Sequence, residues 1–137
     1  MKKFYVIGNP IAHSLSPKLH NHWFKINNIN AVYGKKKLNE EGIKNIIAEI
    51  REGKIDGLNV TTPFKKTVIP FLDELTDVAS EAYSVNTIYK KNNKVIGHNT
   101  DVSGFELAIK KINTNTKNKI FFILGAGGVV PSILIAI

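Results

Sequence analysis

Four polar segments in the first hundred residues carry side chains that could bind and transform a small molecule. They are residues 13–16 (His-Ser-Leu-Ser), 59–65 (Asn-Val-Thr-Thr-Pro-Phe-Lys), 86–87 (Asn-Thr) and 99–101 (Asn-Thr-Asp). Each lies at the end of a predicted strand. Because the loops at the carboxyl edge of a parallel sheet gather into one crevice, we expect these four segments to meet there.

The residue types in these segments suit a small acid that carries several hydroxyl groups. The hydroxyls of Ser14 and Ser16, together with backbone N–H groups, can hold a carboxylate. The side chains of Asn59, Asn86 and Asp101 can hydrogen-bond to hydroxyls. The sequence therefore predicts a binding site for a polyhydroxylated acid.

Lys65 is the residue of this set best suited to move a proton. With Asp101 nearby, its amino group could exchange a proton with an oxygen undergoing reduction or oxidation. Each residue also has an ordinary structural interpretation, such as Ser16 as a helix N-cap, Thr61 at a helix start and Asp101 as a helix cap. On the residues alone, both interpretations stay open.

An alternation of strands and helices supplies the scaffold for these segments. Apolar runs predict strands over 4–8, 31–38 and 56–61. Between them, Ser16-Pro17 predicts the start of a helix that ends near residue 27, with Ser16 as its N-cap. A second helix begins at residue 39 and has isoleucines at helical spacing, namely Ile43, Ile46, Ile47 and Ile50. This order predicts an α/β fold with a mostly parallel, helix-covered sheet.

The elements that follow are shorter. They are a helix that opens at Thr62-Pro63, helices over 74–83 and 101–112, and strands over 84–90 and 94–98. The asparagines in 91–93 suit a tight turn between those two strands. The polar residues 114–118 are typical of a linker, so we expect a first domain over 1–112 and a second over 113–137.

A glycine-rich segment follows the apolar run 119–124, which itself predicts a strand. Gly125-Ala126-Gly127-Gly128 then leads into an apolar helix. This order is typical of the start of a Rossmann-type domain, where glycines let backbone N–H groups approach a pyrophosphate. A βαβ unit needs about 30 residues, and only nine follow Gly128. We therefore expect a fragment that holds the first strand, glycine-rich loop and helix stub of that domain.

Composition argues against several classes of protein. Apolar residues make up 43% and charged residues 22% of the 137, as in ordinary globular proteins. No apolar run reaches the roughly 18 residues of a membrane span, and the N-terminal run is too short for a secretory signal. The absence of cysteine removes disulfides and thiolate metal sites, and it fits a cytoplasmic protein.

The net charge of +8 does not indicate a nucleic-acid partner. It comes from scattered lysines, and Arg51 is the only arginine. Since arginine is the preferred residue for bidentate phosphate and base contacts, we expect a solvated lysine surface. We expect neither a membrane nor a metal ion as a partner.

Five motifs in this chain together resemble the shikimate dehydrogenase family. In chain order they are 8–17, 57–65, 82–87, 97–101 and 125–128. Five motifs in the same order and at matching spacing are highly specific. The resemblance covers this whole chain, but only about the first half of the family's usual length.

The resemblance implies NADP-dependent reduction of 3-dehydroshikimate to shikimate, in aromatic amino-acid biosynthesis. It implies an α/β substrate domain followed by a Rossmann-type domain for NADP. Ser14 and Ser16 would bind the substrate carboxylate. The residues lining the ring and its hydroxyls would be Asn59, Thr61, Asn86 and Asp101. Lys65 would be the catalytic proton donor and acceptor, with Asp101 as its partner.

The resemblance also implies a cofactor site. The phosphate loop would consist of Gly125, Ala126, Gly127, Gly128 and Val129. Asp77 would lie near the cofactor. The chain departs from the family in two places: Tyr83-Ser84 replaces a more usual Gly-Ala, and Pro131 stands where a polar or basic residue is common.

Three other interpretations remain. The chain could be a free module that binds shikimate without turnover, or part of a sister enzyme acting on quinate. The serines at 14 and 16 favour shikimate over quinate. A nucleic-acid-binding domain is the third, and it lacks the expected arginine clusters. The exposed apolar end could also pair two copies into a homodimer.

Overall fold

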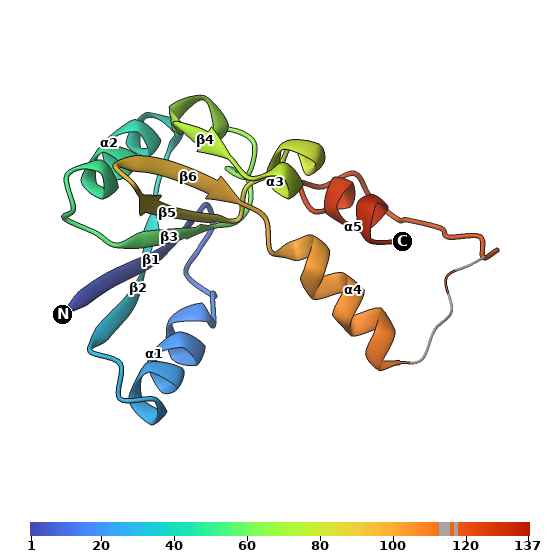
Figure 1. Cartoon of the computed structure of the whole chain (residues 1–137), viewed down its shortest axis with the longest axis horizontal. Helices are drawn as coiled ribbons and strands as arrows, with labels where there is room; N and C mark the ends of the chain where they lie inside the picture. The colour runs from blue at the N-terminus through green and yellow to red at the C-terminus, as the bar shows by residue number, and fades with distance from the viewer. Residues whose placement is uncertain (113–115, 117) are drawn as a thin grey trace.

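The computed structural model describes residues 1–112, 116 and 118–137 and arranges them around one sheet (Figure 1). The strands are β1 Lys2–Gly8, β2 Ala31–Lys37, β3 Gly57–Val60, β4 Glu74–Leu75, β5 Thr87–Lys91 and β6 Lys94–His98. The helices are α1 Ser16–Ile26, α2 Glu40–Arg51, α3 Asp77–Ala82, α4 Asp101–Lys111 and α5 Val130–Ala136, with a 3₁₀ helix at Ile69–Phe71.

The sheet is mixed but mostly parallel. Its six strands lie in the order β2-β1-β3-β5-β6-β4. β1 runs parallel to both β2 and β3, and β4 runs parallel to β6. Only β5 is antiparallel to its two neighbours. The predicted α/β fold with a mostly parallel, helix-covered sheet is therefore confirmed for the part of the chain before residue 100.

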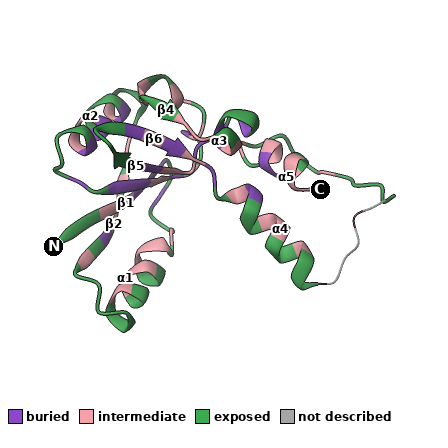
Figure 2. Cartoon of the chain, viewed as in Figure 1, coloured by how far each residue is buried: buried purple, intermediate pink, exposed green. Residues whose placement is uncertain are grey.

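Helices α1 and α2 lie on opposite sides of the sheet (Figure 1). Neighbouring residues of a strand point to opposite faces, so Ile7 and Val6 of β1 belong to different cores. Ile7 is fully buried in the larger cluster with the four isoleucines predicted for α2. Val6 belongs to a smaller cluster with Tyr33 on the other face. Phe24 of α1 packs against this smaller cluster. Burial is concentrated in the central strands and α2 (Figure 2).

Helix α2 begins at Glu40, one residue after its predicted start at residue 39. The side chain of Asn39 accepts a hydrogen bond from the Gly42 N–H at 3.1 Å, which satisfies one of the free donors at the start of a helix. The turn between β5 and β6 is also confirmed. Asn92 and Asn93 have φ values of 51° and 63°, the left-handed conformation that a tight hairpin turn requires.

Helix α1 differs from its prediction in two ways. Leu15, not Ser16, precedes the helix as its N-cap, and no side chain caps it. The apolar residues of one predicted face, such as Trp23 and Ile26, are about half exposed at 45% and 59%. The contact with the sheet is made by Phe24, whose ring lies 5.8 Å from that of Phe4.

The predicted short helix at Thr62-Pro63 is wrong. The chain there forms hydrogen-bonded turns, in which Phe64 N donates to Thr61 O at 3.0 Å, and only 69–71 is helical. The next predicted helix, 74–83, is shortened because Glu74 and Leu75 pair with β6. In both segments, pairing with neighbouring strands and turns outweighs local helical preference.

The predicted strand over 119–124 is also wrong, because these residues are not in a strand. Ile120, Phe122 and Leu124 are 85%, 88% and 99% exposed. A strand needs a partner strand for its N–H and C=O groups, and no described strand pairs with this segment. The linker predicted at 114–118 and the start of the second domain at 113 lie largely outside the described residues.

In the part of the chain that the structure describes, no helix has the length and apolar character needed to cross a membrane.

His20 packs its imidazole against the ring of Tyr33. The two ring centroids lie 4.2 Å apart and the planes differ by 4°. Burial lowers the pKa of His20 below its usual 6.5, because the charged form is poorly solvated there. The folded protein therefore holds this histidine neutral at a pH where the unfolded chain already binds a proton.

This difference predicts a pH dependence of stability. When a histidine has a lower pKa in the folded protein than in the unfolded chain, it does not change the free energy of unfolding at a pH above the unfolded pKa. As the pH falls below the unfolded pKa, the free energy of unfolding decreases. The free energy of unfolding, measured with urea from about pH 8 down to about pH 5, should fall more steeply for the natural chain than for His20→Phe. An NMR titration that places the His20 midpoint at or above 6.5 would contradict this prediction.

Candidate functional site

Lys65 and Asp101 form a hydrogen-bonded ion pair between distant parts of the chain. Lys65 lies in the turns after β3, and Asp101 is the first residue of α4. Lys65 Nζ lies 2.7 Å from Asp101 Oδ2, and the two side chains are only 13% and 24% exposed. The backbone of Lys65 is also held, since Val85 N donates to its carbonyl oxygen at 2.8 Å.

Asn86 fixes the second oxygen of the Asp101 carboxylate. Its Nδ2 donates to Asp101 Oδ1 at 2.9 Å and to the Thr100 hydroxyl at 2.8 Å. Its Oδ1 accepts from Thr100 N at 2.9 Å. With Lys65 on one oxygen and Asn86 on the other, the carboxylate has a defined orientation.

Asn59 extends this network away from the ion pair. Its Nδ2 donates to the Asn86 carbonyl and to the Thr87 hydroxyl, each at 3.1 Å. Its Oδ1 accepts from the Tyr33 hydroxyl at 2.7 Å. Burial raises the pKa of Tyr33 above its usual range, so its phenol remains a hydrogen-bond donor at neutral pH.

Ser14, Ser16 and Thr61 line a neighbouring pocket of about 310 Å³. Ser14 Oγ accepts from the Ser16 N–H at 3.3 Å, which orients the two serines together. Thr61 reaches this pocket because β1 approaches it closely. A Cβ added at Gly8 would lie 2.6 Å from Thr61 Cγ2, so only glycine fits there.

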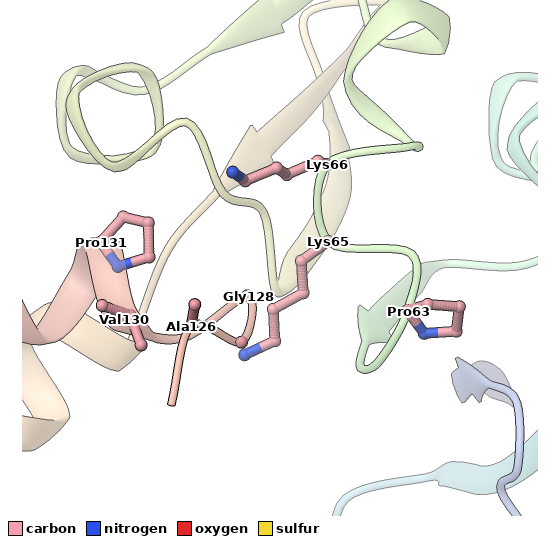
Figure 3. Close-up of a pocket in the computed structure, with 8 residues that line it drawn as sticks. Pro63, Lys65, Lys66, Ala126, Gly128, Val130 and Pro131 are labelled. Atoms are coloured by element: carbon pink, nitrogen blue, oxygen red, sulfur yellow. The ribbon is translucent and has the colours of Figure 1, made fainter. Parts of the chain in front are cut away.

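A second pocket, of about 330 Å³, lies between Lys65 and the glycine-rich loop (Figure 3). Lys65 extends toward Ala126 and Gly128, and the side chain of Lys66, which also lines this pocket, extends in another direction (Figure 3). A Cβ added at Gly128 would lie 3.8 Å from Lys65 Cβ. The lysine is therefore positioned between the polar network and the glycine-rich loop.

The structure brings most of the predicted site residues to one edge of the sheet. Asn86 and Thr87 reach it from the amino end of β5, not a carboxyl end, because β5 is antiparallel. Asp77, Gly125 and Val129 are not among the residues that line the pocket beside the loop, although Ala126, Gly127 and Gly128 are.

Tyr33 is a contributor that the sequence did not reveal. It lies inside β2, where an aromatic side chain is expected to be core, and nothing in the local pattern shows that its hydroxyl meets Asn59. Among the described residues, no group of three His, Asp or Glu side chains is placed to hold a metal ion.

The sequence of this chain matches a family of known proteins. Residues 6–88 match the profile of the shikimate dehydrogenase substrate binding domain.

The chain belongs to the shikimate dehydrogenase family.

Other members of the family align along nearly the whole chain. A shikimate dehydrogenase (NADP(+)) of Pelagibacter ubique is 60% identical over 99% of this chain, and one of Desulfitobacterium hafniense is 42% identical over 100%. A crystal structure from Thermus thermophilus, in complex with NADP(H) and shikimate, covers 99% of this chain with a TM-score of 0.89 and 31% identity.

The chain spans about half the length of these relatives. The aligned part makes up 51% of the Pelagibacter protein, 50% of the Desulfitobacterium protein and 51% of the Thermus chain. What the rest of a family member contributes is therefore outside this chain.

The hydrogen bond from Tyr33 to Asn59 should stabilise the fold. Replacing Tyr33 by Phe leaves the Asn59 oxygen without its donor and should cost about 1–3 kcal/mol of unfolding free energy. The measurement is urea unfolding of Tyr33→Phe, with Tyr89→Phe on β5 as the matched control. Equal effects of the two substitutions would show that the bond to Asn59 contributes nothing specific.

Proposed function

We propose that this chain supplies the substrate domain of an enzyme that uses NADP to interconvert 3-dehydroshikimate and shikimate. The observation that carries the proposal is the position of the Lys65–Asp101 pair, with polar side chains on one side and the glycine-rich loop on the other. Family membership supports it, as does the Thermus relative's complex with NADP(H) and shikimate.

The polar side chains divide between the two ends of such a substrate. Ser14 and Ser16 bind its carboxylate, in the pocket that they line together. Ring hydroxyls are bound by the residues that surround the ion pair, namely Asn59, Thr61, Asn86 and Asp101. The hydrogen bonds already present among these side chains hold them in place, which lowers the cost of ordering them around a ligand.

Lys65 moves the proton. One N–H of its ammonium group is used by Asp101, and the remaining N–H groups can reach a substrate oxygen. As the ring carbonyl is reduced, its oxygen gains negative charge and takes a proton from Lys65, which then recovers one from solvent. Asp101 orients the lysine through their 2.7 Å hydrogen bond. In the reverse direction, Lys65 accepts the proton from the hydroxyl.

The glycine-rich loop is the proposed contact with the cofactor, which when bound supplies or accepts the hydride. A Cβ on Gly127 would meet no protein atom within 4 Å, and Gly125 has φ of 116°, so the loop backbone is open to a ligand. We assign the contact to residues 125–129 and place Asp77 in its vicinity. We also assign residues 1–112 to the substrate domain and 113–137 to the start of a Rossmann-type domain.

A shikimate-binding module without turnover is the second candidate. It is favoured by the side chains of Asn59, Asn86 and Asp101, which hydrogen bonds within the described residues of this chain already hold in place. The polar network around Asp101 would then bind the acid without any partner in redox chemistry.

Calorimetric titration of shikimate into the chain tests the binding proposal. Saturable binding that is lost in Asn86→Ala but retained in Asn92→Ala, a turn residue far from the pair, is the expected result. Addition of NADP⁺ and shikimate to the chain joined to the second half of the Pelagibacter protein then separates the two candidates, because only an enzyme produces the absorbance of NADPH. A folded chain that binds no shikimate would contradict the proposed substrate site.

Lys65→Met tests the proton transfer, with Lys44→Met on α2 as the matched control. In an enzyme that joins this chain to the second half of the Pelagibacter protein, Lys65→Met should lower kcat by about 10²–10⁴, the usual contribution of a general acid or base. Lys44→Met should leave kcat nearly unchanged, since that side chain is exposed on α2 and lines neither pocket of the site. A loss of less than about tenfold for Lys65→Met would rule out the role.

A further inference from the structure

Three buried polar side chains lie behind the site and take no part in the proposed chemistry. Ser84, Asn99 and Ser132 are 0%, 1% and 0% exposed. We refer to them as the buried polar trio. Buried polar groups are costly unless they are hydrogen-bonded, so their arrangement indicates what they hold together.

Asn99 is the centre of the trio and uses its whole side-chain amide. Its Nδ2 donates to the Ser84 carbonyl and to the Ser132 hydroxyl, each at 2.9 Å. Its Oδ1 accepts from the N–H groups of Asp101 and Val102, at 2.8 and 3.3 Å. Asn99 therefore ties the start of α4, where Asp101 lies, to α5.

Ser84 connects the same region to the glycine-rich loop. Its hydroxyl donates to the Gly128 carbonyl oxygen at 3.0 Å, across 44 residues of sequence. The next residue, Val85, donates its N–H to the Lys65 carbonyl at 2.8 Å. Two adjacent residues, Ser84 and Val85, therefore hydrogen-bond to the glycine-rich loop and to the backbone of Lys65, respectively.

We propose that Ser84 is a positioning residue that sets where the glycine-rich loop lies relative to Lys65. The proposal rests on the proposed function, in which a hydride and a proton must arrive at the two ends of one carbonyl bond. A misplacement of about 1 Å in such a geometry can lower the rate about 10²-fold. A loop with three glycines in four residues has many conformations available, and the Ser84 bond restricts them.

The Ser84 hydroxyl can be removed without disturbing the rest of the trio. Ser84→Ala keeps the backbone carbonyl that Asn99 uses and changes the side-chain volume little. It leaves the Gly128 carbonyl without its donor. The loop and α5 then lose a tie to the substrate domain, while the bonds that hold Asp101 and Lys65 remain.

Amide hydrogen exchange on the chain measures this tie directly. In Ser84→Ala, exchange should accelerate about fivefold or more within 127–136, which includes the hydrogen-bonded amides of Val130 and Ile133. Exchange within β5 and β6 should be unchanged. Ser103→Ala, which removes an exposed hydroxyl of α4, is the matched control and should change neither region.

Ser132→Ala provides a second variant, because it breaks the bond of α5 to Asn99 and leaves Ser84 intact. It should also accelerate exchange within 130–136. If neither variant changes exchange in these residues, or if Ser103→Ala changes it equally, the proposed tie is overturned.

Turnover tests the consequence for catalysis, in the enzyme joined to the Pelagibacter second half. Ser84→Ala should lower kcat about tenfold or more while the calorimetric Kd for shikimate stays the same. Faster loop exchange with unchanged kcat would overturn the positioning role. If the natural sequence itself shows no turnover, the proposed function fails, whereas the exchange result still decides whether Ser84 holds the loop.

Discussion

The ion pair between Lys65 and Asp101 requires two segments 36 residues apart to meet at one point. An ammonium and a carboxylate that are both largely buried are costly unless each is satisfied by a partner. Here the carboxylate is shared by Lys65 and Asn86, and the lysine backbone is held by Val85. The ends of β3, β5 and β6, which carry these groups, must therefore lie side by side. The pairing of the three strands in the sheet places them so.

The register of three strands places the site in a single row. Asn59 of β3 pairs with Thr87 of β5, and Thr87 pairs with His98 of β6. Since β5 is antiparallel to both neighbours, its amino end lies beside the carboxyl ends of β3 and β6. The turns after β3 then carry Lys65, and the chain after β6 carries Asp101. A slip of one residue in either pairing would turn the side chains of the shifted strand, such as Asn59 or Thr87, to the other face of the sheet.

Behind this row, polar groups continue into the region of the glycine-rich loop. Asn99 supports the start of α4, and Ser84 reaches the loop itself. The same stretch of chain, 84–86, thereby contacts the lysine backbone, the aspartate and the loop. Ser84 and Val85 bond to the loop and to Lys65 instead of to a neighbouring strand, so the strand predicted from residue 84 begins only at Thr87.

Local pattern was sufficient for the elements whose preferences agree with their surroundings. The helical spacing of the α2 isoleucines and the asparagine turn at 92–93 were both predictable, because each depends on neighbours a few residues away. The polar segments that form the site were also evident. They place hydroxyl, amide, ammonium and carboxylate groups after successive predicted strands, a combination that can bind a small acid.

Only the tertiary structure decided how these groups contact one another. The hydroxyl of Tyr33 meeting Asn59, the Ser84 bond to Gly128 and the reversal of β5 depend on partners tens of residues away. The segment 119–124 shows the converse, since its apolar pattern predicts a strand and no described strand pairs with it. Sequence by itself determined which side chains can do chemistry and which segments prefer helix or strand. Long-range pairing decided the rest, because hydrogen bonds between strands and between buried polar groups exist only once both partners are in place.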